Sequence, residues 1–419
     1  MSSFVFSVLF AAALLASVAL RIWLARRQVK HVARHRQNVP PAFADRIELA
    51  SHQRAADYTV ARVGFGSVDL AIQTFMLIAL TLFGGLQWLY ELAASWLPDS
   101  PLLAQLAFLT LVAVVQSLVE LPLDAYRQFV LEKRFGFSRM TPSLFVADLF
   151  RGAAIAAIIG LPLALVVLWL MRVSGPAWWL YVWLVWIGFN LLLLIIYPTL
   201  IAPRFNRFEP LPQGPLRERV EGLLARCGFR AQGLFVMDGS KRSNHGNAYF
   251  TGFGRAKRIV FFDTLISRLD ADQIEAVLAH ELGHFRHRHV IKRLLVGFVG
   301  SFLGLALLGW LSGEAWFYEG LGMDPGAIGH EAPALLLFML AGPVFLFPLR
   351  PLVSFLSRKD EFEADAFAAE HTDARHLVDA LVKLYQDNAS TLTPDPLHSA
   401  FYDSHPPAAI RVGRLLASA

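Results

Sequence analysis

The chain has 419 residues, of which 55% are hydrophobic and 17% charged, and its mean hydropathy is +0.47. These values lie outside the range of soluble domains and indicate a membrane protein. The formal charge of +5 does not indicate a nucleic-acid partner, because basic residues cluster beside apolar stretches instead of alternating with aromatic residues. Cys227 is the only cysteine, which excludes an intrachain disulfide, a cysteine-ligated metal and a CxxC redox site.

Seven apolar stretches are long enough to cross a hydrocarbon core of about 30 Å. They lie near residues 4–24, 65–95, 102–121, 150–171, 177–199, 291–312 and 331–349. We interpret the first as a membrane anchor and not as a cleaved signal peptide, because Met1 to Leu20 contain no basic residue and the positive charges follow the apolar run.

Basic residues in the connecting segments indicate which side of the membrane each one faces. They are frequent in 21–64 and 122–151. They are nearly absent from the alternate loops, which are 96–101, 172–177 and 313–334. Seven spans with the N-terminus outside fit this pattern and place the remaining polar stretches together on the cytoplasmic side.

The topology divides the chain into four regions. They are a five-span membrane region (1–200), the first part of a catalytic region (201–290), a two-span membrane region (291–349) and the second part of the catalytic region (350–419). In the first catalytic part, the residue pattern predicts a helix and three β-runs. These are Leu216 to Cys227, Gly233 to Met237, Asn247 to Phe253 and Arg258 to Phe262.

A further helix is predicted from about Gln273, with Asp270 or Asp272 as its N-cap, and it continues into the sixth span near Val290. This helix contains an HExxH motif, His280-Glu281-Leu282-Gly283-His284. The i, i+4 spacing places two imidazoles on one helix face, where both reach a single Zn²⁺, and leaves Glu281 alongside as the general base. The alternative is a chance pattern on a solvated helix face.

A catalytic zinc site needs a third protein ligand. Position 290 is a valine, which excludes the third histidine of the metzincin pattern. The best candidate is Glu361 on a later helix, because Asp365 follows it at i+4 and can orient a ligand histidine. Glu363 lies on a different helix face and is the weaker candidate. Taken alone, this segment would be an ordinary acidic helix surface.

Several other stretches accompany the zinc motif in order along the chain. They are FVLEKRFGF (129–137), IAPRFN (201–206), RSNHGNAYF (242–250), EFEAD (361–365) and SHPP (404–407). With them, the chain from about residue 40 to its end resembles the Ste24-type CAAX prenyl proteases of the M48 metallopeptidase family. The resemblance places Glu361 at the third-ligand position. It also implies a mainly α fold, in which seven transmembrane helices form a barrel around an intramembrane chamber and carry a cytoplasmic α+β zincin region.

By the same resemblance, Asn247, His405 and Arg411 line the substrate site. Asn247 begins a run that fits either an edge strand to which a substrate peptide adds or a structural hairpin. His405 and Arg411 are candidates to stabilise the oxyanion or bind a terminal carboxylate, although a histidine before Pro-Pro also fits a simple turn. His287 and His289 do not continue the i, i+4 face and are interpreted as supporting or interfacial residues, and His245 is unassigned.

The residues and the resemblance together predict an integral-membrane zinc metalloendopeptidase with one Zn²⁺ ion. Its expected partners are the lipid bilayer and a peptide or protein substrate, including prenylated ones, and the expected state is a monomer. The competing functions are a membrane-protein quality-control protease without prenyl specificity and a transporter or channel with structural zinc. We expect a bacterial inner-membrane protein with a cytoplasmic active site, or an endoplasmic-reticulum protein if the source is eukaryotic.

Overall fold

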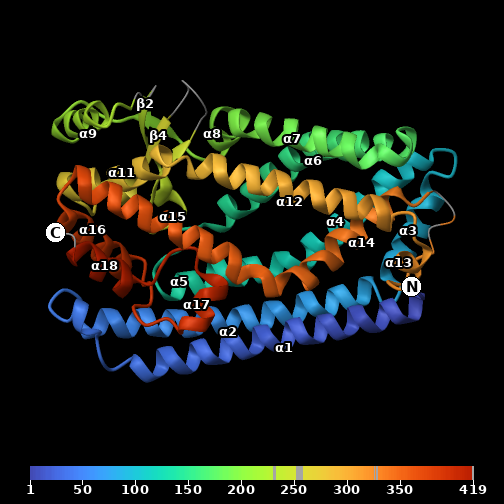
Figure 1. Cartoon of the computed structure of the whole chain (residues 1–419), viewed down its shortest axis with the longest axis horizontal. Helices are drawn as coiled ribbons and strands as arrows, with labels where there is room; N and C mark the ends of the chain where they lie inside the picture. Colours follow the sequence, from blue (N-terminus) through green and yellow to red (C-terminus); the bar gives the residue numbers. More distant parts are fainter. Residues whose placement is uncertain (230–232, 252–257, 325, 327–328, 418–419) are drawn as a thin grey trace.

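The computed structural model describes residues 1–419 except 230–232, 252–257, 325, 327–328 and 418–419. The described residues are mainly helical and include one four-stranded sheet. Long helices run along most of the molecule, and the sheet packs at one end with shorter helices and the C-terminus (Figure 1). The predicted class, a mainly α multi-pass membrane protein with an α+β region, is confirmed.

Among the described residues, seven helical segments are long and apolar enough to cross a membrane, as predicted. They are Ser3–His35, Leu49–Leu80, Pro101–Arg134, Pro142–Val173, Gly175–Phe205, His289–Leu311 and Glu331–His371. Many of their apolar side chains are exposed, and Phe75 and Ile158 keep 71% and 72% of their surface accessible. This exposure is unfavourable in water and is accepted by the hydrocarbon interior of a bilayer.

The membrane half is built from eleven of the described helices. They are α1 (Ser3–His35), α2 (Leu49–Leu80), α3 (Gly85–Trp96), α4 (Pro101–Tyr126), α5 (Glu132–Arg134), α6 (Pro142–Val173), α7 (Trp178–Ile196), α8 (Ala202–Phe205), α12 (His289–Leu311), α13 (Ala315–Glu319) and α14 (Glu331–Leu346). Two π-helical turns, Arg127–Leu131 and Tyr197–Ile201, connect α4 to α5 and α7 to α8. Short 3₁₀ turns lie at Pro41–Phe43, Gly175–Ala177, Gly239–Lys241 and Phe347–Leu349.

The predicted second span, 65–95, is wrong in its extent. Helix α2 starts sixteen residues earlier and ends at Leu80, and α3 is a separate helix that starts at Gly85. Gly84 between them has a φ of 74°, a left-handed conformation that favours glycine. A Cβ on Gly85 would lie 2.6 Å from the carbonyl oxygen of Ala79, so the tight turn also needs a glycine there.

The catalytic region contains the sheet and seven helices. The strands are β1 (Phe208–Pro210), β2 (Gly233–Met237), β3 (Ala248–Thr251) and β4 (Arg258–Phe262), in the order β1-β2-β4-β3, with only β2 and β4 parallel. The helices are α9 (Pro215–Arg226), α10 (Asp263–Ile266), α11 (Ala271–Arg286), α15 (Arg350–His371), α16 (Ala374–Asp387), α17 (Pro396–Tyr402) and α18 (Ala408–Ala417).

The strands and α9 confirm the sequence prediction closely. Both β2 and β4 have the predicted bounds, and α9 differs from the predicted helix by one residue at each end. Strand β3 covers the central part of the predicted run 247–253, whose last two residues lie outside the described residues. Helices α11 and α12 do not form the predicted continuous helix, because Arg288 between them has a φ of 57°.

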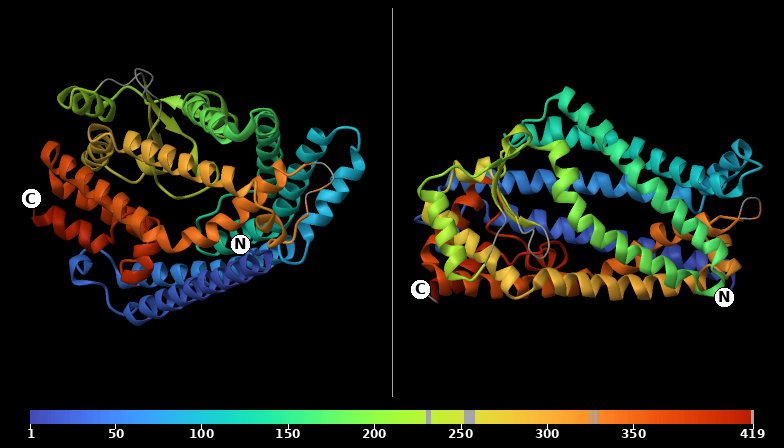
Figure 2. Two further views of the ribbon diagram at one scale, coloured as in Figure 1. Left: turned by 45° about the vertical axis from the view of Figure 1, so that its right-hand side comes forward. Right: turned by 90° about the horizontal axis from the view of Figure 1, so that it is seen from above.

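The two parts of the catalytic region share one hydrophobic core, although a two-span membrane segment separates them in sequence. Buried side chains of α9, β4, α11, α16 and α18 contribute to this core, and so does Phe43 from the α1–α2 connection. A second core lies among the membrane helices. Figure 2 shows the catalytic helices and the sheet gathered at the end of the helix array that also holds the C-terminus.

An ion pair joins this region to the first membrane helix. Arg27 of α1 donates through Nε and Nη2 to the carboxylate of Asp395, at 3.2 and 2.9 Å. Asp395 also caps α17, because its side chain accepts from the backbone N–H groups of Leu397 and His398. The pair therefore anchors the segment that leads from α17 to His405.

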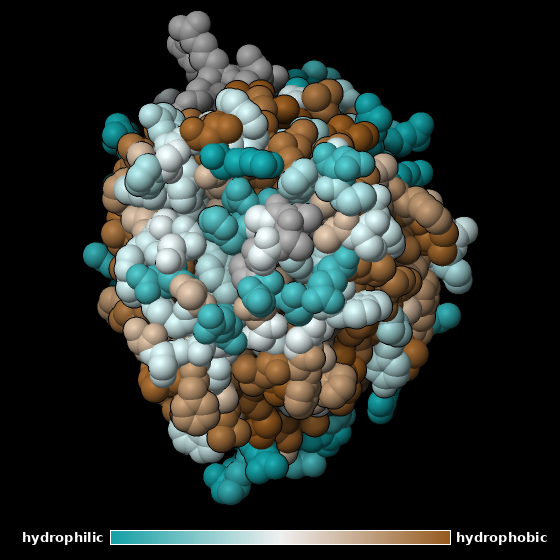
Figure 3. Space-filling view, turned by 90° about the vertical axis from the view of Figure 1, so that its right-hand side faces the viewer, coloured by the Kyte–Doolittle hydropathy of each residue, from teal (hydrophilic) through white to brown (hydrophobic). Residues whose placement is uncertain are grey.

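The opposite end of the molecule carries α3, α13 and the connection into α14 (Figure 1). Seen end-on, this face is of intermediate to hydrophilic character at its centre, with hydrophobic side chains gathered toward its upper, right and lower edges (Figure 3).

Candidate metal centre and active site

Helix α11 carries the HExxH motif and has a well-defined start. The Asp270 side chain accepts from the backbone N–H of Gln273 at 2.9 Å, and the Gln273 side chain accepts from the N–H of Asp270 at 3.3 Å. This reciprocal capping box shows that Asp270, and not Asp272, is the N-cap. Beyond it, the apolar face of α11 is buried in the core, which fixes the rotation of the helix and hence the direction of its polar side chains.

The glycine inside the motif brings α11 into close contact with α15. A Cβ on Gly283 would lie 2.8 Å from the Cα of Ala364 and 3.1 Å from its carbonyl oxygen. The two backbones therefore touch at the point where Glu361 and Asp365 flank Ala364 on α15. Sequence analysis missed this role, although a glycine inside a helix costs about 1 kcal/mol relative to alanine and thereby signals a packing requirement.

His280, His284 and Glu361 converge at this contact. Their ligating atoms all lie within 4.8 Å of one another. The Nε2 atom of His280 lies 3.5 Å from Oε2 of Glu361, and Nε2 of His284 lies 3.4 Å from Oε1. Glu361 Oε2 is buried and has no hydrogen-bond partner within the part of the chain that the structure describes. A buried carboxylate whose two oxygens each face an imidazole nitrogen fits a metal ion, and the donor set of two histidines and a glutamate suits zinc.

Asp365 and Arg411 support the first of these histidines. Asp365 Oδ1 lies 2.9 Å from Nδ1 of His280, on the side of the ring opposite the Nε2 atom that faces Glu361. Arg411 is buried and donates twice to the same carboxylate, from Nη2 at 2.6 Å and from Nε at 2.9 Å. Its third nitrogen, Nη1, lies 3.9 Å from Glu361 Oε2. Most of the hydrogen-bonding capacity of Arg411 is therefore directed at Asp365.

The two histidines of the motif have opposite pKa shifts. Burial lowers the pKa of His280, but the neighbouring carboxylates of Asp365 and Glu361 favour its charged form, outweigh burial and raise the pKa to about 9. Burial and the nearby His280 lower the pKa of His284 to about 4. If both rings held a metal through Nε2, each would have to be neutral, so His280 would give up a proton on binding it.

Glu281 faces a cavity of about 120 Å³ that Asn247, His405 and Arg411 also line. Burial raises the pKa of the Glu281 carboxyl. A raised pKa suits a group that must first take up a proton and then release it near neutral pH. The structure thus brings the predicted base and the three residues carried over by resemblance to one cavity.

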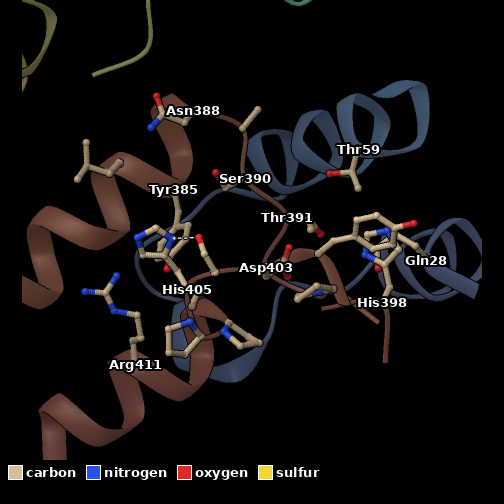
Figure 4. Close-up of a pocket in the computed structure, with 18 of the residues that line it drawn as sticks. Gln28, Thr59, Tyr385, Asn388, Ser390, Thr391, His398, Asp403, His405 and Arg411 are labelled. Carbon is tan, nitrogen blue, oxygen red and sulfur yellow. Dashed lines mark hydrogen bonds between the residues drawn. The ribbon is translucent and has the colours of Figure 1, made fainter. Parts of the chain in front are cut away.

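His405 lies at the junction with a larger cavity of about 650 Å³. Its Nε2 is 3.5 Å from Glu361 Oε2, and its side chain is 60% exposed. Figure 4 shows His405, Arg411 and Tyr385 at one end of this cavity, with Gln28 and His398 at the other. Sequence reasoning did not single out Tyr385, because an aromatic residue on an amphipathic helix carries no local signal of function.

Asn247 immediately precedes β3, and its side chain accepts from the N–H of Ala248 at 2.8 Å. Strand β3 pairs antiparallel with β4 and is the last strand of the sheet that the structure describes. It is therefore an edge strand as well as one half of an antiparallel pair. The previously unassigned His245 stacks on Phe137, with ring centroids 4.5 Å apart, and its Nδ1 lies 3.1 Å from Oδ1 of Asn388. His245 therefore connects separate segments around the site.

We predict that Gly283→Ala disrupts this site. The added Cβ collides with backbone atoms of α15, which cannot move as freely as a side-chain tip, and overpacking of this kind costs about 1–3 kcal/mol. The variant should melt at a lower temperature in detergent and lose metal on mild dialysis. Gly413→Ala is the control, because its Cβ would meet no atom within 4 Å. A Gly283→Ala protein with the stability and metal content of wild type would contradict this role.

The comparisons with known proteins agree with this geometry. Residues 28–207 match the family described as CAAX prenyl protease N-terminal, five membrane helices, and residues 210–419 match peptidase family M48. CAAX prenyl protease 1 homolog of Arabidopsis thaliana is 35% identical, with 89% of each chain covered. CAAX prenyl protease 1 of Saccharomyces cerevisiae is 33% identical, with 96% of this chain and 93% of the relative covered.

A solved structure is similar over nearly the whole chain. The crystal structure of S. mikatae Ste24p has a TM-score of 0.91 and 31% identity, and the match covers 98% of this chain and 99% of that one. The metal-binding geometry, both family matches and this structural likeness lead to one conclusion. The chain belongs to peptidase family M48 and is an integral-membrane zinc metalloprotease of the CAAX prenyl protease type.

Proposed function

We propose that His280, His284 and Glu361 hold one zinc ion and that Glu281 is the general base of peptide hydrolysis. The observation that carries this proposal is the buried Glu361 carboxylate, whose two oxygens face the two motif histidines and whose Oε2 has no hydrogen-bond partner among the described residues. When bound there, zinc supplies a Lewis acid that activates water and polarises the scissile carbonyl. Glu281 takes the proton from the attacking water and gives it to the leaving amine.

The remaining residues bind and orient the substrate or the ligands. The free edge of β3 provides main-chain partners for an extended peptide beside α11, and Asn247 lies at the start of that edge. His405 is exposed to the cavity and donates a hydrogen bond to the oxyanion. Arg411 acts through Asp365, which it holds against His280, while its Nη1 adds positive charge near Glu361.

The substrate we propose is the C-terminal segment of a membrane-associated, lipidated protein. The relatives named CAAX prenyl protease 1 support this class. So does the large cavity that adjoins His405, because α1 and α2 contribute Gln28 and Thr59 to its lining. The competing role is membrane-protein quality control without prenyl specificity. Cleavage of a farnesylated reporter peptide but not of its unmodified twin supports the first role, and equal cleavage of both supports the second.

We predict that Glu281→Gln abolishes hydrolysis and leaves zinc content near one ion per chain. The amide cannot accept the proton, whereas no metal ligand is lost. Glu275→Gln on the same helix is the matched control, because Glu275 pairs with Arg226 on the outer side of α11 and should keep full activity. Turnover retained by the Glu281 variant would exclude it as the base.

We also propose that the active site faces the cytoplasm and that the protein is a monomer in a bacterial inner membrane, or in the endoplasmic reticulum of a eukaryote. The alternation of basic and non-basic loops supports this orientation. The structure supports a monomer in that a single chain supplies every group of the proposed site. The four regions 1–200, 201–290, 291–349 and 350–419 remain our proposed domain division.

Cysteine labelling tests this orientation. In a Cys227→Ser background, Glu319→Cys lies on one exposed end of the molecule and Arg375→Cys on the other. A membrane-impermeant maleimide should label the first variant in intact cells and the second only after permeabilisation. The reverse result would place the zinc site outside the cytoplasm.

A further inference from the structure

A second series of side-chain contacts leads away from the proposed metal ligands and starts at His284. We propose that His289 and Glu363 form a hydrogen-bonded chain that orients His284, as Asp365 orients His280. The inference rests on the proposed metal site and assigns functions to two side chains outside it. His289 and Glu363 are positioning residues. Neither belongs to the group of His280, His284 and Glu361, and neither is among the residues that line the cavity in front of Glu281.

His289 reaches His284 because of the break between α11 and α12. Arg288 has left-handed backbone angles, φ 57° and ψ 33°, which an arginine adopts only at an energetic cost. This turn makes His289 the first residue of α12 and directs its ring back toward α11. His289 is 1% exposed, and its Nδ1 lies 2.9 Å from Nδ1 of His284. A continuous helix would have carried the ring away from His284.

The contacts allow one arrangement of protons when a metal is bound. His284 presents Nε2 to the cluster, so the proton of its neutral ring must be on Nδ1. That N–H donates to Nδ1 of His289, which must therefore be an acceptor. The proton of His289 is then on Nε2, and this group donates to Glu363 Oε2 at 3.0 Å. In this arrangement every N–H of the hydrogen-bonded series faces an acceptor.

Helix α15 thus supplies a carboxylate to each ligand histidine. Asp365 is four residues from Glu361, shares its helix face and contacts His280 directly. Glu363 is only two residues from Glu361, which places it on another face and too far around the helix to contact His284. The imidazole of His289 spans that separation. For the same geometric reason, Glu363 is a weaker candidate than Glu361 for a metal ligand.

A competing interpretation is a second metal site, because His289, Asp360 and Glu363 also place ligating atoms within 4.8 Å of one another. Two cations already accompany these carboxylates. Arg293 Nε lies 3.0 Å from Asp360, and Lys292 Nζ lies 3.8 Å from Glu363. In addition, Nδ1 of His287 lies 3.9 Å from Oε2 of Glu363. The local charge is therefore balanced by the protein, which favours the orienting chain over a second ion.

The test uses variants of His289 in the full-length protein, with the zinc dissociation constant measured by chelator competition. His289→Leu removes the acceptor and should weaken zinc binding about 10- to 100-fold, the usual effect of losing such a partner. His289→Asn keeps an oxygen near the position of Nδ1 and should restore most of the affinity. Glu363→Gln keeps a hydrogen-bond acceptor but loses the negative charge. Its zinc affinity should lie between those of wild type and His289→Leu. Glu370→Gln, exposed on the same helix, is the matched control.

A second readout separates orientation from general stability. Cobalt-substituted protein should show an altered visible absorption spectrum in His289→Leu and a nearly native spectrum in His289→Asn, because the ligand geometry differs only in the former. Glu363 is on a partly exposed surface, so its variant tests the chain even where His289→Leu does not fold. Equal zinc affinity in wild type, His289→Leu and Glu363→Gln would overturn the inference, as would two zinc ions per wild-type chain. Wild-type protein that binds no zinc would instead refute the proposed metal site itself.

Discussion

The backbone contact between α11 and α15 at Gly283 and Ala364 is the constraint on which the site depends. The proposed zinc ligands lie on these two helices, and a zinc ion needs donors about 2.0–2.2 Å away, so the separation of the helices decides whether the ligands converge. Glycine at the contact allows this approach. The motif histidines and Glu361 then face one another without any strand or loop having to deliver a ligand.

The membrane anchors both helices that meet at this contact. Helix α15 continues the last apolar segment, and α12 begins three residues after α11 ends. Charges buried at such a boundary need partners. Arg411 satisfies Asp365, Asp365 satisfies His280, and Arg27 of α1 anchors the segment that leads to His405. The first set of contacts joins α18, α15 and α11, and the Arg27–Asp395 pair joins the C-terminal segment to the membrane half.

The features that follow local patterns could be predicted from the sequence. Hydropathy predicted the seven spans, β-branched and aromatic runs predicted β2 and β4, and the i, i+4 spacings predicted which side chains share a face. Features that depend on distant segments could not be predicted. Arg288 has no glycine or proline beside it to signal a helix break, and the pairing of Arg411 with Asp365 arises only after α18 packs on α15. The break at Gly84 did have a local signal, the Gly84-Gly85 pair, but the long apolar stretch around it led to the prediction of one span.

The coordination of the metal tests the account most directly. Zinc K-edge X-ray absorption of the purified full-length protein reports the number of imidazole ligands and the nature of the other donors. We predict one zinc per chain with two imidazoles and otherwise oxygen donors, and the oxygen shell should change in Glu361→Gln while both imidazoles remain. A spectrum with three imidazoles, or one that is unchanged by Glu361→Gln, would show that a residue other than Glu361 completes the site.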